Sequence, residues 1–435
     1  MFGAEMAIPW RQLLYSTTTT TKWSSPILSP HSSTVVCTSL SSPLQINQSV
    51  RYHGVCRAAV VGKVVEKDVS KQKKTNAFEI ESLTSWLLEQ QRVGNIDAEL
   101  TIVINSISLA GKQIASLLQR ANISKLTGSQ GTINIQGENQ AKLDVIANEV
   151  FCNCLRSTGL TGIIASEEEE APIAVEETYS GNYTVVFDPI DGSSNIDTSL
   201  TTGSIFGIYD SSNNKLSLAE SEPEPTESNS TPAAMQQWKL DEKKQQTIVS
   251  VCQPGRNLLA AGYCMYSSSV VFVLSLGKGV FSFTLDPMYG EFILTQKNIR
   301  IPKSGNIYSF NESNYELWDD KLKKYIDDLK VSPAATPSGA KRYSARYIGC
   351  LVGEIHRTLL YGGIYGNPSN IKSKKGNLRL LYECAPMSYL VEQAGGKGSD
   401  GYQRILDIVP EEVHQRVPIF IGSPEEVAKL EKYLA

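Results

Sequence analysis

Residues 188–195 read Asp188-Pro189-Ile190-Asp191-Gly192-Ser193-Ser194-Asn195 and follow directly on an apolar run at 183–187. A β-type run that ends in acids places Asp188 and Asp191 at the end of a buried strand. Gly192 lets the backbone approach a ligand, and Ser193 and Ser194 offer hydroxyl and N–H donors at a helix start. Because free N–H groups and the helix dipole both favour an anion, this stretch predicts a phosphate site.

A second pair of acids, Glu167 and Glu168, also follows a short apolar run, at 162–165. Four acids that converge in one cleft repel one another unless a cation neutralises them. Mg²⁺ prefers oxygen ligands and can bridge to a substrate phosphate, so the pattern predicts a divalent-cation site. The next two acids, Glu169 and Glu170, are instead expected to face solvent, as runs of acids commonly do.

The spacing of apolar residues predicts helices and strands in mixed order. Helices are expected from Asp97, as N-cap, to about 121 and after Asp144. Short β-type runs at 162–165, 183–187 and 204–209 follow them. Because helices precede strands in this way, the sequence predicts a layered α/β fold.

Two α/β domains are expected in the part of the chain that folds. The first covers residues 75–268 and carries the acids, and the composition of 210–246 predicts an exposed loop insertion within it. Apolar runs at 270–276 and 280–285 flank a Gly-Lys-Gly turn and predict a hairpin that opens the second domain, 269–435.

The first 58 residues differ in composition from the rest of the chain. Serine and threonine dominate them, and Glu5 is the only acid before Glu66. This composition is typical of an import sequence, and the scarcity of arginine favours a plastid over a mitochondrion. We therefore predict a chloroplast transit peptide at 1–58, with a disordered native tail as the alternative.

Charge and cysteine content narrow the class of partner. The 435 residues carry a formal net charge of −4 and eight cysteines. That charge gives no basic field for nucleic acid, and no apolar run approaches the about 18 residues that span a bilayer. The cysteines lack the paired spacing of a zinc site. The sequence therefore predicts a small-molecule partner, with no nucleic acid and no membrane.

The acid motifs resemble those of the fructose-1,6-bisphosphatase family, chloroplast type. The motif at 188–192 alone is shared with inositol phosphatases, and the downstream stretches select the fructose family. Similar stretches lie at 142–145, 188–197, 203–209, 345–349, 356–358 and 380–386. The resemblance implies a layered αβαβα sugar-phosphatase fold, a homotetramer, and Mg²⁺-dependent hydrolysis of fructose 1,6-bisphosphate to fructose 6-phosphate and phosphate in the chloroplast stroma.

The resemblance also implies a set of metal and catalytic residues. It assigns Mg²⁺ ligation to six residues: Glu138, Glu167, Asp188, the carbonyl of Ile190, Asp191 and Glu383. It makes Asp144, Glu167 and Glu168 catalytic, with Asp144 or Glu168 taking the proton of the attacking water. A residue of the same type caps helices, so Asp144 is equally well explained as the N-cap of the helix that follows it.

Two groups of substrate contacts follow from the same resemblance. The first holds the phosphate at the metal end: Asp191, Gly192, Ser193 and Ser194. The second holds the sugar and the 6-phosphate: Asn311, Tyr315, Arg346, Tyr347 and Arg379. Arg346 is expected to reach across a subunit interface.

The chain departs from the family pattern at the 6-phosphate end. Asn367 stands where the family has tyrosine, and Asn377 stands where it has lysine. Losing a charged partner costs about 1.5 to 3 kcal/mol, so we expect weaker binding of the 6-phosphate. Smaller departures are Asn139, Ala141, Cys350 in place of serine and Glu354 in place of aspartate. Alternatives are therefore a phosphatase of another sugar bisphosphate, such as sedoheptulose 1,7-bisphosphate, or a catalytically weak regulatory homologue.

Regulation is expected to differ from that of the light-regulated plastid enzyme. That enzyme carries extra cysteines in the loop at 210–246, but this loop has none. Only Cys252 stands at a matching position, and a lone thiol cannot form the intrachain disulfide that thioredoxin reduces. The sequence therefore predicts that activity is insensitive to thioredoxin.

Overall fold

The computed structural model of the chain describes five stretches: residues 80–133, 139–175, 181–211, 247–331 and 342–435. The predicted transit peptide, 1–58, and Glu138 lie outside these stretches, as does nearly all of the predicted loop insertion at 210–246.

The larger sheet has eight strands in the order β10-β9-β8-β7-β6-β5-β3-β4. Only β3 and β5 run parallel, and the other pairs are antiparallel. In chain order the strands are β3 (Thr161–Ser166), β4 (Ile173–Ala174), β5 (Tyr183–Asp191), β6 (Thr202–Asp210), β7 (Leu258–Tyr266), β8 (Val270–Ser275), β9 (Val280–Asp286) and β10 (Glu291–Gln296). Every residue of β5 is buried, which places the acid motif in the interior.

The predicted hairpin at 270–285 forms as β8 and β9, but it does not open a second sheet. Strand β8 pairs with β7, from which only a three-residue turn at 267–269 separates it, so the hairpin continues the first sheet. Sequence reasoning missed β7 itself, and without that strand the hairpin had no visible partner. The second sheet begins only with β11 (Ile307–Phe310).

The smaller sheet has five strands in the order β12-β11-β13-β15-β14. The remaining members are β12 (Ser344–Ala345), β13 (Ile364–Asn367), β14 (Lys397–Ser399) and β15 (Ile419–Gly422). Side chains alternate across β13 and β15 because successive residues of a strand point to opposite faces. Ile364 and Phe420 pack into an outer cluster, whereas Tyr365 and Ile421 pack into the cluster between the sheets.

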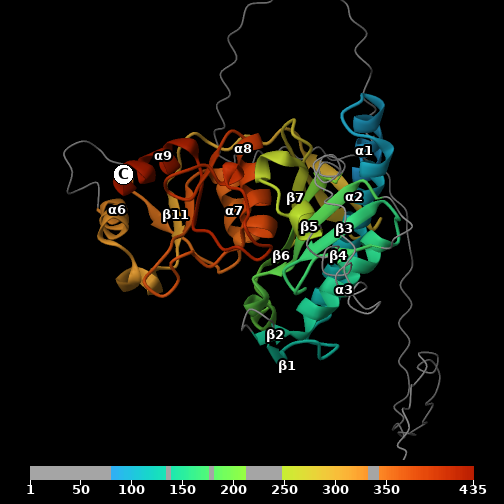
Figure 1. Ribbon diagram of the computed structural model, residues 1–435, viewed down its shortest axis with the longest axis horizontal. Helices are drawn as coiled ribbons and strands as arrows, with labels where there is room; N and C mark the ends of the chain where they lie inside the picture. The colour runs from blue at the N-terminus through green and yellow to red at the C-terminus, as the bar shows by residue number, and fades with distance from the viewer. Residues whose placement is uncertain (1–79, 134–138, 176–180, 212–246, 332–341) are drawn as a thin grey trace, which may run out of the picture. The chain divides into compact units, whose positions relative to one another are not determined.

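Helices and sheets alternate in five layers (Figure 1). The helices are α1 (Leu83–Arg92), α2 (Ala98–Gln119), α3 (Lys142–Arg156), α6 (Asp320–Lys330), α7 (Leu351–Tyr361), α8 (Ala385–Gln393) and α9 (Pro424–Leu434). One apolar cluster joins α1, α2 and α3 to the larger sheet, and a second joins α7 and α8 to both sheets. A third joins α6 and α9 to the smaller sheet. The predicted αβαβα order is confirmed.

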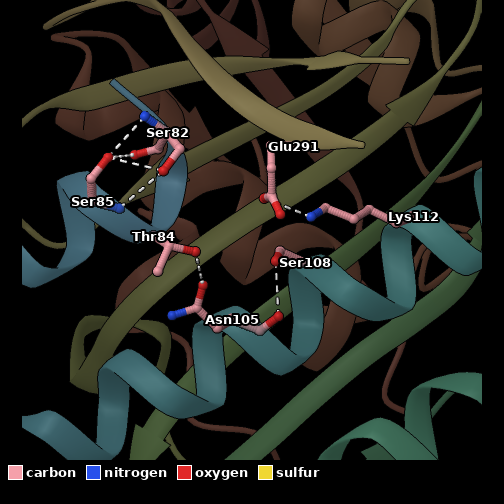
Figure 2. Close-up of polar contacts among 7 residues, drawn as sticks. All are labelled: Ser82, Thr84, Ser85, Asn105, Ser108, Lys112 and Glu291. Atoms are coloured by element: carbon pink, nitrogen blue, oxygen red, sulfur yellow. Dashed lines mark hydrogen bonds and ion pairs between the residues drawn. The ribbon is translucent and has the colours of Figure 1, made fainter. Parts of the chain in front are cut away.

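Helix α2 is a core helix of the larger sheet. By length and composition it could cross a membrane, but most of its apolar window is buried. Asp97 is its N-cap, as predicted, and accepts a hydrogen bond from the backbone N of Leu100 at 2.7 Å. Figure 2 shows two further contacts: Thr84 of α1 donates to Asn105 at 2.9 Å, and Lys112 bonds Glu291 of β10 at 2.8 Å. These contacts fix α2 against its neighbours.

Helix α3 begins one turn earlier than the N-cap alternative for Asp144 requires. Ala141 occupies the N-cap position, and Asp144 lies at the third helical position. From there its Oδ2 accepts a hydrogen bond from the backbone N of Ala141 at 3.1 Å. Asp144 is therefore not the N-cap, although it does satisfy an N–H at the start of the helix, as acids at this position do.

Candidate active site

The end of β5 brings two acids to the same side of the sheet. Residues three apart on a regular strand point to opposite faces. Between Asp188 and Asp191, however, the pairing with β6 is irregular, and such irregularities re-aim side chains. The hydroxyl of Ser204 on β6 donates to the carbonyl of Pro189 at 2.6 Å and holds the irregular turn in place.

Glu383 joins these two acids from a distant part of the chain. It lies on a π-helical turn, η5 (Leu380–Cys384), that leads into α8. Its Oε2 accepts a hydrogen bond from the backbone N of Arg379. Carboxylate oxygens of Asp188, Asp191 and Glu383 lie within 4.8 Å of one another, and all three residues are buried. Three of the predicted metal ligands therefore form one cluster.

The electrostatics of the cluster favour a bound cation. Asp188 is only 2% exposed, and burial, followed by the charge of Glu167, raises its pKa well above the usual value. Burial and Glu167 act in the same way on the pKa of Glu383. The donors are hard carboxylate oxygens, which suit Mg²⁺ better than a soft metal. A divalent cation would therefore relieve the cost of burying these charges together.

Asp191 is held by the first turn of α7. Its Oδ2 accepts hydrogen bonds from the backbone N of Val352 at 2.7 Å and from the Cys350 thiol at 3.0 Å. Burial raises the pKa of Asp191, and these two hydrogen bonds oppose that rise. The start of α7 thus orients Asp191, and the sequence did not indicate that contact.

Glu167 and Arg379 border the acid cluster. The backbone N of Glu167 donates to the carbonyl of Phe187 at 3.2 Å, so Glu167 emerges beside the end of β5. The Nε of Arg379, whose side chain is almost wholly buried, lies 3.9 Å from Glu167 Oε1. The structure thus places Arg379 at the metal end, whereas the resemblance associated it with the 6-phosphate end.

The other acids of the 167–170 run have separate environments. Glu168 is half-buried, and its backbone N donates to Ser166 Oγ at 3.3 Å. Glu169 is also half-buried and accepts a hydrogen bond from Asn148 of α3 at 2.7 Å. The solvent-facing prediction is therefore wrong for Glu169, because α3 supplies a partner, and right for Glu170, which is exposed. Asp144 of α3 is buried close enough to raise the pKa of Asp188.

The turn after Asp191 has the backbone that the sequence predicted. Gly192 adopts a left-handed conformation with φ of 76°, and a short helix, η1 (Ser193–Thr198), follows it. A Cβ at Gly192 would lie 2.8 Å from the Cβ of Cys350, so only glycine fits. Ser193 is half-buried and Ser194 is exposed, which leaves both accessible beside the acids.

Four polar residues gather at the other end of the site. Asn311 follows β11 directly, and its side chain lies close enough to Tyr347 to oppose the rise in pKa that burial causes in that tyrosine. The side chain of Asn367 likewise opposes the rise in pKa that burial causes in Tyr365, which is buried next to Tyr347. Sequence reasoning missed Tyr365. The only signal for it was its place in the apolar run before Asn367.

Three other residues near this end point elsewhere. The hydroxyl of Tyr315 donates to Asp327 of α6 at 2.7 Å, and its ring lies 5.1 Å from Lys330 Nζ. Arg346 is exposed, and its Nη1 donates to the carbonyl of Ala345 at 2.8 Å. Within one chain the Tyr315 hydroxyl thus bonds α6, and the side chains of Arg346 and Asn377 are exposed.

A buried acid cluster beside a left-handed glycine turn, within five αβαβα layers, is the arrangement expected of sugar phosphatases that work with metal ions. The chain belongs to the fructose-1,6-bisphosphatase family. The family model described as the N-terminal domain of fructose-1-6-bisphosphatase matches residues 81–297, and the C-terminal domain model matches 301–435. The family predicted from the sequence is confirmed.

Individual relatives agree with this assignment. The chain is 67% identical to chloroplastic fructose-1,6-bisphosphatase 1 of Arabidopsis thaliana over 88% of this chain and 87% of that protein. It is 61% identical to the chloroplastic enzyme of Spinacia oleracea over 97% and 99%. The crystal structure of Leishmania major fructose-1,6-bisphosphatase in holo form superposes with a TM-score of 0.70 at 39% identity, covering 82% of this chain and 99% of that one. The chloroplast location is confirmed by such chloroplastic relatives.

Proposed function

We propose that the protein hydrolyses fructose 1,6-bisphosphate to fructose 6-phosphate and phosphate, with Mg²⁺ as cofactor, in the carbohydrate metabolism of the chloroplast stroma. The observation that carries the proposal is the cluster of Asp188, Asp191 and Glu383, whose carboxylate oxygens lie within 4.8 Å of one another. The names of the relatives support the choice of substrate.

The cluster has the chemistry that phosphoryl transfer needs. When bound, Mg²⁺ supplies charge neutralisation and Lewis acidity for an in-line displacement. The clustered acids, together with Glu167 and the carbonyl of Ile190, would hold the cation. The turn at Gly192 would present Ser193 and Ser194 to the phosphate. Asp144 or Glu168 would accept the proton of the attacking water.

The other end of the site would hold the sugar and the 6-phosphate. Asn311, directly after β11, and Tyr347, which lies close enough for Asn311 to affect its pKa, would supply contacts there. Arg346 would act from a neighbouring subunit of a homotetramer, in keeping with its exposure. Arg379 would balance charge at the metal end, since it lies beside Glu167. Tyr315 would have to release Asp327 before it could contribute.

A second substrate is favoured by one observation. Asn367 offers an amide in place of a phenol, and Asn377 is exposed and uncharged, so this end of the site lacks two phosphate partners that the family pattern has there. A different bisphosphate, such as sedoheptulose 1,7-bisphosphate, or a weak regulatory role remains the alternative to the main proposal.

The experiment compares phosphate release from the two bisphosphates by the wild-type chain and by the double variant Asn367→Tyr, Asn377→Lys. We expect the wild type to prefer fructose 1,6-bisphosphate. The variant should lower KM about tenfold or more, since a restored charged partner contributes about 1.5 to 3 kcal/mol. A wild type that hydrolyses only sedoheptulose 1,7-bisphosphate would replace the main proposal with the second. No turnover of either, in a folded protein, would favour the regulatory role.

A further inference from the structure

Glu354 is a wholly buried carboxylate on α7, at 0% exposure, between the two ends of the site. A buried charge is costly unless hydrogen bonds and an opposite charge satisfy it. The family resemblance gives this position an aspartate and assigns it no role in binding or chemistry. Its partners therefore decide what the side chain does.

Three donors from three separate segments converge on Glu354. Ser309 of β11 donates its hydroxyl to Oε2 at 2.5 Å. The backbone N of Ile348 donates to Oε1, and Nη2 of Arg357, one turn along α7, donates to Oε2. The carboxylate thus ties the end of a strand and a loop to one helix.

Two of those segments carry the groups proposed to hold the 6-phosphate. Ser309 lies two residues before Asn311, and Ile348 directly follows Tyr347. The carbonyl of Ile348 is held as well, because it accepts a hydrogen bond from Asn195 at 3.0 Å. Side chains therefore hold both the backbone N–H and the carbonyl of Ile348.

The helix that carries Glu354 also orients the metal end. The backbone N of Val352 donates to Asp191 at 2.7 Å, within the same turn of α7. A rigid first turn of α7 therefore sets the spacing between the acid cluster and the pair formed by Asn311 and Tyr347. An error of about 1 Å in that spacing is enough to weaken the binding of a substrate that is held at both ends.

We propose that Glu354 is a positioning residue that fixes the loop at 345–349 and the end of β11, and so sets the affinity for the phosphate that is not cleaved. This inference rests on the proposed function. That phosphate keeps its charge throughout the reaction, so its contacts bind the substrate and the transition state equally. Losing such uniform binding raises KM and leaves kcat nearly unchanged.

The test is Glu354→Gln, which keeps the shape but removes the charge and one acceptor oxygen. We expect KM for fructose 1,6-bisphosphate to rise about tenfold, with kcat within about twofold of the wild type. With fructose 1-phosphate, which lacks the second phosphate, the variant and the wild type should have the same KM. Should Glu354→Gln fail to fold, Ser309→Ala removes one donor only and should raise KM in the same direction by less.

The chain offers a matched control in Glu426 of α9. It too is buried and accepts one hydroxyl, from Tyr343 at 2.7 Å, and one backbone N–H, from Gly305 at 3.2 Å. Glu426→Gln should lower the thermal midpoint much as Glu354→Gln does and leave KM unchanged.

Several results would overturn the inference. They are an unchanged KM in Glu354→Gln, an equal rise with fructose 1-phosphate, a fall in kcat alone, or the same KM change in Glu426→Gln. A wild type that turns over neither substrate would instead overturn the proposed function, and the inference would fall with it.

Discussion

At the residue scale, the acid cluster makes the stability of the metal-free protein depend on pH. Burial and mutual repulsion raise the pKa values of Asp188 and Glu383 in the folded state. A carboxyl group whose pKa is raised by folding contributes stability below its unfolded value and loses that contribution as the pH rises toward the raised value. This pH dependence of stability is opposite in sign to that of a carboxylate in a salt bridge, whose pKa folding lowers.

We therefore predict that the free energy of unfolding of the metal-free protein falls as the pH rises above 3.8, the ordinary pKa of an aspartate. Saturating Mg²⁺ should remove that loss near neutral pH, because the cation neutralises the charges. Thermal midpoints measured across pH, with Mg²⁺ and with a chelator, check this. Parallel curves with and without Mg²⁺ would show that no cation occupies the cluster.

The local structure around individual site residues could be predicted from the sequence, whereas the contacts between distant site residues could not. The strand and the turn at 188–195 follow from local chemistry, and the structure has both. That Asp188 and Asp191 share a side depends on an irregular pairing with β6. Glu383 arrives through a π-helical turn almost two hundred residues later, and no local pattern specifies that approach.

At the element scale, the turn between β5 and η1 depends on Gly192. Any side chain there would meet Cys350, whose thiol donates to Asp191, and would adopt a backbone conformation that costs about 1 to 3 kcal/mol. Packing of the turn against α7 thus orients a proposed metal ligand.

We predict that Gly192→Ala lowers the free energy of unfolding by more than that backbone cost alone and reduces phosphate release at least about tenfold. Gly290→Ala is the matched control, since Gly290 has φ of 67° and no atom within 4 Å of an added Cβ. It should pay the backbone cost only and keep full activity. Denaturant unfolding and rate measurements check both variants, and equal activity in the two would contradict the role given to the turn.

Helix boundaries could be predicted from the sequence more readily than the pairing of strands. Helix α2 and its cap at Asp97 were predictable because capping and apolar spacing are local. The assignment of the hairpin β8–β9 to the first sheet was not, because it depends on the unrecognised strand β7. Strand pairing is set by neighbours that local periodicity does not reveal.

At the scale of the whole molecule, the cysteines of the described stretches are poorly placed for redox chemistry. Five of the six cysteines in the described stretches are buried, and Cys252 is half-buried. Burial raises the pKa of Cys252 to about 11, so little reactive thiolate forms at neutral pH. Its expected partners in the loop at 210–246 are absent from the sequence.

We predict that incubation with dithiothreitol, or with an oxidised dithiol, leaves the rate of phosphate release within about twofold of the untreated value. Cys252→Ser should behave like the wild type in both treatments. An activation by reductant that Cys252→Ser abolishes would contradict this prediction, because it would show that Cys252 forms a disulfide.

The five layers also explain why the two ends of the site were predicted unequally. The metal end depends on the ends of β3 and β5, which are neighbours in one sheet. The 6-phosphate end depends on β11, on β13 and on a loop fixed by α7, which come together only when the second sheet packs on the helices between the sheets. Consequently, the sequence did not indicate that Arg379, associated with the 6-phosphate end, lies beside Glu167, and Tyr365 was overlooked.

The most direct test of the central claim is the release of phosphate from fructose 1,6-bisphosphate as Mg²⁺ is titrated, with the wild-type chain, Glu383→Gln and the control Glu426→Gln. We predict saturable, Mg²⁺-dependent release by the wild type and the control. Glu383→Gln should lose at least about a hundredfold in rate and require more Mg²⁺, because a metal ligand is removed. Release that is independent of Mg²⁺, or unaffected by Glu383→Gln, would contradict a metal-dependent phosphatase centred on this cluster.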